Sequence, residues 1–163
     1  MQTIIYRPIG IIHTPFQEQV GVPIQPTAGR GLHGYLTLEP EYLPGLKDLA
    51  GFSHLLLLYH FHLSEGYSLQ AQPYMDETPR GVFAMRAPRR PNPIGLSLVR
   101  LERIEGATLH FLDVDMVDGT PLLDIKPYVP FFRSTDEIRL GWLTGKSRAA
   151  TTTHADDRFL TTE

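Results

Sequence analysis

Residues 81–101 read GVFAMRAPRRPNPIGLSLVRL, two apolar runs separated by a segment rich in proline and arginine. Proline has no amide donor and a fixed φ, so a strand paired on both sides cannot pass through the Pro-Asn-Pro run at 91–93. We therefore expect the chain to leave one strand near Arg86, cross a stiff loop and enter another strand near Ile94. Such a loop loses little entropy when it binds a ligand, which favours a binding site here.

A second segment, DVDMVDGTPLLDIKPY at residues 113–128, also predicts a rigid loop. Its Asp-Gly-Thr-Pro run at 118–121 is a strong turn signal. Beyond the turn, Asp124, Lys126 and Tyr128 alternate with apolar residues. Two rigid loops that are flanked by strands and carry polar groups suit a small-molecule pocket, so we predict one cavity shared by both segments.

The composition is typical of a soluble globular protein. With 163 residues, 42% of them hydrophobic and 20% charged, we expect one domain over 1–144 and a short, loosely ordered polar tail over 145–163. No apolar run is as long as a membrane span, so we expect no membrane partner. The absence of cysteine excludes disulfides and thiolate-bound zinc, and it fits a cytoplasmic location. The net charge of −3 means that RNA binding needs a local basic patch.

Short strands dominate the expected secondary structure. Fourteen glycines and fourteen prolines indicate many turns, and no glycine-rich nucleotide-binding fingerprint lies between a strand and a helix. About six or seven strands without regular intervening helices predict an all-β fold, a single antiparallel barrel with minor helical segments. We expect strands at 3–13, 32–38, 52–63, 81–86, 94–104, 107–117 and 121–126, and helical turns within 39–51 and 135–143.

Two of these expected strands have distinctive residue patterns. The near-continuous apolar run at 52–63 predicts a strand buried on both faces. In the strand at 107–117, Asp113 and Asp115 share the face of the apolar residues Leu109 and Phe111.

Three histidines and a group of aspartates are of residue types that bind metal ions. His54, His60 and His62 share one parity of the apolar strand, but the sequence places no further ligand to complete a site, so we expect no metal. The aspartates between 113 and 124 could bind magnesium only if their oxygens converge. Among them, Asp118 is expected to cap its turn and Asp115 to contact a ligand. Ser97 has no nucleophile elbow around it, so we interpret it as a neutral strand residue.

Five motifs, in this order and spacing, resemble the TrmO family, also called YaeB-like or TsaA-like. They are IGIIHTPF (9–16), VPIQPTA (22–28), LAGFSHLLLLYHFH (49–62), GVFAMRAPRRPNPIGLSLVRL (81–101) and DGTPLLDIKPYVPF (118–131). The resemblance implies a methyltransferase that uses S-adenosylmethionine to methylate N6 of threonylcarbamoyladenosine at position 37 of tRNA. It also implies a TsaA-like antiparallel barrel and a homodimer that binds the cofactor near the subunit interface and the anticodon loop of tRNA.

The resemblance further implies which positions bind the cofactor. These are Pro26, Thr27, Ala28, His62, Leu63, Arg86, Leu96, Leu112, Asp113, Val114 and Asp115. The residues expected to contact RNA are Arg89, Arg90, Asn92, Asp118, Lys126 and Tyr128. We expect Arg86 to pair with the carboxylate of the cofactor and Asp115 to hold a ribose hydroxyl or the ammonium group. The sequence assigns no catalytic base.

The chain departs from the family pattern at several points. Met85 stands where threonine is usual and Arg89 where an aromatic residue or histidine is common. Relative to that pattern we expect neither the arginine- and glycine-rich segment before Gly81 nor a second, C-terminal domain. Two alternatives therefore stay open: a methyltransferase of this fold with another acceptor, and a non-catalytic module that binds S-adenosylmethionine or RNA.

Overall fold

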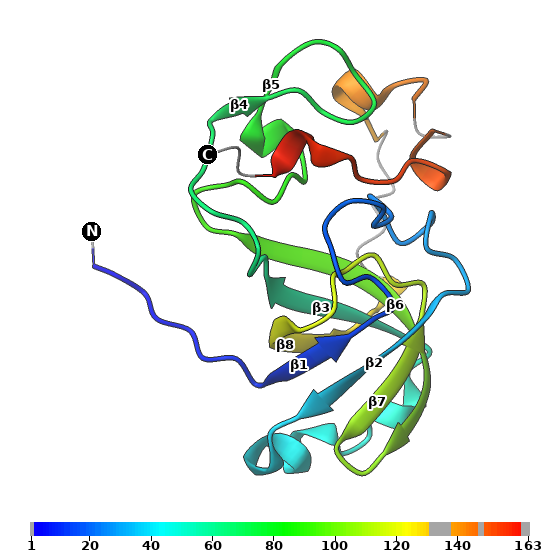
Figure 1. The fold of residues 1–163 in the computed structure, drawn as a ribbon. Helices are drawn as coiled ribbons and strands as arrows, with labels where there is room; N and C mark the ends of the chain where they lie inside the picture. Colours follow the sequence, from blue (N-terminus) through cyan, green and yellow to red (C-terminus); the bar gives the residue numbers. More distant parts are fainter. Residues whose placement is uncertain (1, 131–137, 147–148, 161–163) are drawn as a thin grey trace.

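The computed structural model describes residues 2–130, 138–146 and 149–160 (Figure 1). Within them, strands close into a barrel in the order β1-β2-β7-β6-β3-β8, and neighbouring strands run antiparallel. The barrel strands are β1 (Gly10–His13), β2 (His33–Leu38), β3 (His54–His60), β6 (Ile94–Glu105), β7 (Thr108–Leu112) and β8 (Thr120–Pro127). This closed barrel confirms the predicted all-β, antiparallel fold.

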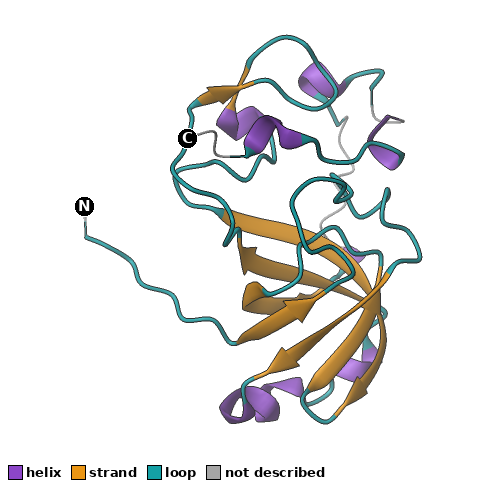
Figure 2. Cartoon of the chain, in the orientation of Figure 1, coloured by secondary structure: helices purple, strands orange, loops and turns teal. Residues whose placement is uncertain are grey.

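Outside the barrel, the described chain forms a hairpin and several short helices (Figure 2). The hairpin pairs β4 (Gln70–Ala71) with β5 (Arg80–Gly81). The helices are of the 3-10 type: η1 (Pro40–Leu46), η2 (Leu49–Gly51), η3 (Val82–Ala84), η5 (Gly141–Leu143), η6 (Ala149–Thr151) and η7 (Asp157–Phe159). In this part of the chain no helix is long and apolar enough to cross a membrane.

The barrel interior is filled by side chains that alternate along each strand. In β3, Leu55, Leu57 and Tyr59 point inward and are buried, whereas the residues between them are half-buried on the outside. The prediction of a strand buried on both faces is therefore wrong, because the closed barrel leaves the outer face of β3 partly accessible. The inward residues form one apolar cluster, whose burial stabilises the fold.

Besides β3, which spans residues 54–60 and not the predicted 52–63, three predicted strands are shorter than expected. The strand predicted over 3–13 begins only at Gly10. Ile9 still donates to the Leu122 carbonyl of β8, whereas the residues before it extend away from the barrel (Figure 1). The strand predicted over 81–86 is instead the end of β5 followed by η3. Val82 and Met85 are both buried, and their spacing of three residues fits a helical turn.

The third shortened strand is β7, which ends at Leu112 although the prediction extended it to residue 117. Asp113 has a φ of 73°, in the left-handed region, and this conformation interrupts the strand. Asp113 and Asp115 therefore do not share the face of Leu109 and Phe111 as predicted. Val114 takes the buried position instead.

The C-terminal residues pack over the loops above the barrel, so the expectation of a loosely ordered tail is wrong for 149–160. In Figure 1, η7 lies near the β4–β5 hairpin, and residues 153–155 pair with the loop after β1. Phe159 is 4% exposed and packs with Met85 and Ala87 in a second apolar cluster. Of the helical turns predicted over 135–143, η5 is observed, and 135–137 lie outside the described residues.

An ionic network ties the C-terminal residues to the hairpin. Asp76 Oδ2 lies 2.6 Å from Arg80 Nη2, and its Oδ1 lies 3.0 Å from Lys146 Nζ. The hydrogen bond from Arg80, and to a smaller extent that from Lys146, holds the pKa of Asp76 well below its usual range. Both cations also lie near the ring of Trp142, which is the single tryptophan of the chain.

Candidate functional site

A cavity of about 830 Å³ lies between one end of the barrel and the loops above it. Its walls come from the loop after β1, the end of β3, the arginine-proline loop with the start of β6, the chain between β7 and β8, and the C-terminal residues. Its volume is in the range of pockets that enclose small molecules. The two segments with turn and proline signals thus line one cavity, as predicted.

The arginine-proline loop presents Arg86, Arg90 and Asn92 to this cavity. The loop is fixed at its end by a hydrogen bond of 2.7 Å from Ile94 N to the Asn92 carbonyl. Arg86 Nη2 donates to the carbonyl of Leu96 at 2.8 Å, which holds the guanidinium against β6. Because a guanidinium has five N–H donors, Arg86 keeps the capacity to bind an anionic group in the cavity.

Asp115 reaches the cavity wall from the irregular chain after β7. Its Oδ1 accepts a hydrogen bond of 2.5 Å from Ser97 Oγ, and Ser97 Oγ lies 3.0 Å from the hydroxyl oxygen of Tyr59. Because Ser97 gives its only proton to Asp115, Tyr59 donates to Ser97. Burial raises the pKa of the Asp115 carboxyl to about 7, although Ser97 and the nearby Arg86 favour the ionised form.

A glycine on β6 allows Tyr59 to take this position. Tyr59 is paired with Gly95 across β3 and β6. A Cβ at Gly95 would lie 2.2–2.8 Å from three atoms of the Tyr59 ring. The ring therefore packs directly on the glycine, and its hydroxyl reaches Ser97, the diagonal neighbour two residues along β6.

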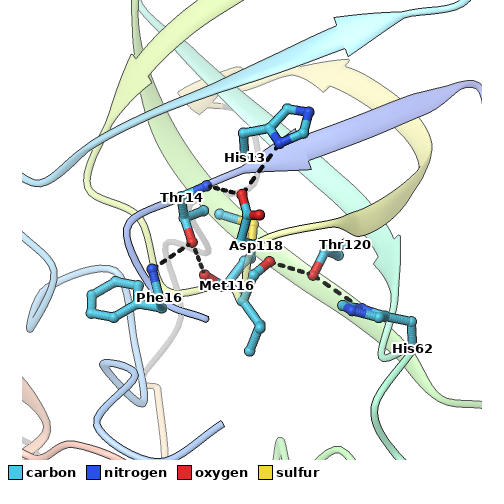
Figure 3. Close-up of polar contacts among 8 residues, drawn as sticks. His13, Thr14, Phe16, His62, Met116, Asp118 and Thr120 are labelled. Carbon is cyan, nitrogen blue, oxygen red and sulfur yellow. Dashed lines mark hydrogen bonds and ion pairs between the residues drawn. The ribbon is translucent and has the colours of Figure 1, made fainter. Parts of the chain in front are cut away.

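A second polar network holds the turn that precedes β8 (Figure 3). Asp118 Oδ1 accepts a hydrogen bond of 3.0 Å from Thr14 N and lies 3.2 Å from His13 Nδ1. Asp118 thus ties the turn to the end of β1. Among the described residues its carboxylate makes no hydrogen bond within its own turn, so the predicted turn cap is not observed, and Asp118 does not line the cavity. His62 does line it, with Nδ1 3.4 Å from Thr120 Oγ1. Burial lowers the pKa of His62, so its imidazole is neutral at pH 7.

The cavity brings together five of the positions that the resemblance implies for the cofactor. These are His62, Leu63, Arg86, Leu96 and Asp115. They come from the chain just after β3, the arginine-proline loop, β6 and the chain after β7, so the barrel assembles them from segments that are distant in sequence.

The other six positions lie beside the cavity and not in its wall. Pro26, Thr27 and Ala28 follow the wall residue Gln25, and Leu112, Asp113 and Val114 precede the wall residue Asp115. The two groups adjoin each other, because a Cβ at Gly29 would lie 2.0 Å from the carbonyl oxygen of Val114. Val114 belongs to the barrel core, and Asp113 Oδ1 accepts a hydrogen bond of 2.7 Å from Gly31 N.

The positions expected to contact RNA are also divided. Arg90 and Asn92 line the cavity, whereas Arg89 does not, and its buried Nε has no partner within the described residues. Lys126 pairs with Asp124 at 2.7 Å. The amide of Tyr128 donates to the His54 carbonyl at the start of β3. The structure therefore places Lys126 and Tyr128 at the opposite end of the barrel from the cavity.

Several wall residues were missed by the sequence analysis. Trp142 and Phe159 come from the C-terminal residues, and Trp142 Nε1 donates to the Ala84 carbonyl at 2.8 Å. Two large aromatic residues in an otherwise polar stretch were the available signal, since such side chains are usually buried. Among the described residues, no group of three His, Cys, Asp or Glu side chains could hold a metal ion.

The comparisons with known proteins agree on one family. Its model, the tRNA-methyltransferase O N-terminal domain, matches residues 11–134. A probable S-adenosyl-L-methionine-binding protein of Pyrococcus abyssi is 51% identical over 156 residues, which cover 96% of this chain and 85% of that protein. The tRNA (adenine(37)-N6)-methyltransferase of Escherichia coli is 38% identical over 144 residues, which cover 82% of this chain and 61% of that enzyme.

A solved structure, that of TrmO from Pseudomonas aeruginosa, matches with a TM-score of 0.72 and 38% identity, over 86% of this chain and 63% of that one. The chain thus spans less than two thirds of the length of the TrmO structure and of the Escherichia coli enzyme. The matched residues include the barrel and both loops with turn and proline signals. The chain belongs to the family of the tRNA-methyltransferase O N-terminal domain.

Proposed function

We propose that this chain is an S-adenosylmethionine-dependent methyltransferase that acts on the N6 of an adenine in tRNA, the modified adenine at position 37 being the expected acceptor. The names of its relatives support this proposal, since those from Escherichia coli and human are tRNA (adenine(37)-N6)-methyltransferases. The observation that carries it is the cavity in which Arg86 and the carboxyl group of Asp115 lie within electrostatic range of each other.

The chemistry of the cavity fits the parts of the cofactor. Arg86 would bind its carboxylate by charge-assisted hydrogen bonds. Leu63, Leu96 and Met116 supply apolar surface for the adenosine. The bound cofactor supplies a methyl group activated by a sulfonium. The chain would mainly hold donor and acceptor in line and exclude water, because alignment is a large part of the acceleration of a bimolecular displacement.

The surroundings of the cavity also suit an RNA acceptor. Arg86 and Arg90 both lie in the wall and give it a local basic patch in a chain of net charge −3, and Asn92 adds an amide to the same wall. Phe83, which is 79% exposed, lies at the same cavity. Exposed aromatic rings of this kind stack on bases that are turned out of a single-stranded loop.

A binding-only function is the second candidate, and a specific observation favours it. The alignment with the relative from Pyrococcus abyssi covers 96% of this chain, and that relative is named a probable S-adenosyl-L-methionine-binding protein. The same cavity and the same Arg86 contact would serve a protein that binds the cofactor without passing on its methyl group.

Incubation with methyl-labelled S-adenosylmethionine and total tRNA separates these functions. Label recovered in an N6-methylated adenosine at position 37 supports the proposed transferase. Label in another nucleoside or in a small molecule supports a transferase of this fold with a different acceptor. Cofactor binding by calorimetry, with no label transferred, refutes the transferase and supports the binding-only function.

Two arginine substitutions test the assigned roles within the cavity. Arg86→Ala should weaken cofactor affinity by about 10- to 100-fold, the equivalent of one charge-assisted hydrogen bond. Arg90→Ala should weaken tRNA binding and leave cofactor affinity unchanged. Arg103→Ala is the matched control, because Arg103 lies on β6 and pairs with Glu105 instead of lining the cavity. Cofactor affinities equal to wild type in both cavity variants would refute these roles.

We also propose the homodimer that the family resemblance implies. Light scattering should then give twice the 18.4 kDa mass of the chain. A monomer mass at micromolar concentration, with the cofactor bound, would refute the dimer.

A further inference from the structure

Methyl transfer to an adenine N6 releases a proton, and few groups in the cavity can accept it. The titratable residues among the described part of the wall are Tyr59, His62, Tyr74, Arg86, Arg90 and Asp115. The arginines stay protonated, and burial raises the pKa of both tyrosines, so none of these four accepts a proton at neutral pH. His62 and Asp115 remain.

The geometry separates these two candidates. Asp115 is the single carboxylate among the described residues of the wall, and it is held by Ser97, which is 1% exposed and itself held by Tyr59. Tyr59 and Ser97 belong to β3 and β6, so rigid strands fix the position of the carboxylate. His62 lies just past the end of β3, and the hydrogen-bond contact of its Nδ1 with Thr120 is long, at 3.4 Å.

The protonation behaviour of the two candidates points the same way. A base works best when its pKa lies near the operating pH. Burial raises the pKa of Asp115 to about 7, with Arg86 and Ser97 acting in the opposite direction, whereas burial and His60 lower the pKa of His62. Asp115 is therefore the stronger base of the two and is still substantially ionised at neutral pH.

Building on the proposed function, we propose that Asp115 is the general base of the methyl transfer, and that Ser97 and Tyr59 position its carboxylate. In this step the N6–carbon bond forms as the carbon–sulfur bond breaks, and the electron pair of the broken bond stays on sulfur. The N6 proton passes to a carboxylate oxygen of Asp115. The hydrogen bond from Ser97 to Oδ1 fixes the rotation of the carboxylate, and the bond from Tyr59 fixes Ser97.

Asp115→Asn tests this role against that of a partner for the cofactor ammonium or ribose. Asparagine retains an oxygen that accepts from Ser97, but it cannot take the proton. Cofactor affinity measured by calorimetry should stay within about threefold of wild type. The single-turnover rate should fall by about 100- to 10,000-fold, as expected for loss of a general base. A rate within tenfold of wild type, or a loss explained by weaker cofactor binding, overturns the proposal.

A titration of the protein without cofactor gives a readout that does not depend on activity. In carbon-13 NMR of labelled aspartate, the Asp115 carboxyl should titrate near pH 7, and its signal should be absent from Asp115→Asn. Ser97→Ala should move the midpoint upward, because a hydrogen bond to the ionised form is lost. The pH profile of kcat/KM should rise with the same midpoint and show the same shift. Titration below pH 5, or an unshifted Ser97→Ala profile, overturns the proposal.

Failure of this role is distinguishable from failure of the proposed function. Wild-type protein that binds the cofactor and methylates no tRNA refutes both. Wild-type activity that persists in Asp115→Asn, but loses its pH dependence in His62→Gln, refutes the role of Asp115 alone and assigns the proton to His62.

Discussion

Gly95→Ala tests whether the packing of Tyr59 on β6 determines both the stability of the barrel and the position of the cavity network. The added Cβ would lie 2.2, 2.4 and 2.8 Å from three atoms of the Tyr59 ring, all far closer than van der Waals contact. The ring is 5% exposed and belongs to the barrel core, so it cannot move without displacing other core side chains. Overpacking of this kind costs about 1–3 kcal/mol.

Urea denaturation followed by circular dichroism measures this cost. With a slope of about 2 kcal/mol per molar urea, the unfolding midpoint should fall by about 0.5–1.5 M. Gly45→Ala is the control, because a Cβ there has no neighbour within 4 Å. Its free energy of unfolding should stay within about 0.5 kcal/mol of wild type. The Asp115 carboxyl should also titrate at higher pH in Gly95→Ala, since the displaced Tyr59 no longer holds Ser97.

A double-mutant cycle decides whether the clash with the ring is the cause. Tyr59→Leu removes the ring atoms that the new Cβ meets, so the two substitutions together should cost less than the sum of their separate costs, by about 0.5 kcal/mol or more. Strictly additive costs, or a Gly95→Ala midpoint equal to that of wild type, would refute the reasoning.

Three further changes test other parts of the molecule. Phe159→Ala should lower the free energy of unfolding by about 3 kcal/mol and speed amide hydrogen exchange in the C-terminal residues. Leu160→Ala, which changes the exposed neighbouring residue, should do neither. The stability of Asp115→Asn relative to wild type should rise between pH 4 and pH 8. The reason is that a folded-state pKa raised to about 7 makes wild type lose stability over that window; parallel pH curves would contradict it. Asp76→Asn should change the fluorescence of Trp142 at neutral pH, because it releases the two cations that lie near the ring. In wild type the same change should occur only in acid, because the lowered pKa of Asp76 keeps its carboxylate ionised and both cations bound at neutral pH. Identical emission at pH 7 would contradict this.

Strands with a clear pattern were predictable from the sequence, and β2, β6 and β8 begin and end within a residue or two of the predicted bounds. Residues 81–86 were harder because their burial is set by distant segments. Met85 is buried by Phe159, which lies 74 positions later in the chain. No local sequence pattern indicates such a contact. For this reason the apolar residues 81–86 were predicted as a strand, although they contain η3.

The candidate site was likewise predictable where the signals are local and not predictable where the contacts are between distant segments. Proline and turn signals predicted two rigid loops, and the structure joins the two segments at one cavity, although Asp115 was expected inside a strand. The contacts that give Asp115 its properties were not predictable, because they require the pairing register of β3 and β6. Ser97, interpreted as a neutral strand residue, becomes the direct partner of Asp115 only when that register brings Tyr59 alongside it.

The backbone conformation of Asp113 determines that Asp115, and not Asp113, lines the cavity. Continued as a strand, β7 would point Asp113 into the barrel core, but its φ of 73° turns the carboxylate outward to Gly31 N and lets Val114 fill the core position. Aspartate tolerates this conformation better than a β-branched residue, for which it costs about 1–2 kcal/mol. Asp113→Val should therefore be less stable than Asp113→Gly by at least that amount, although valine is the more apolar residue. Equal stabilities would mean that the left-handed turn does not keep Asp113 and Asp115 apart.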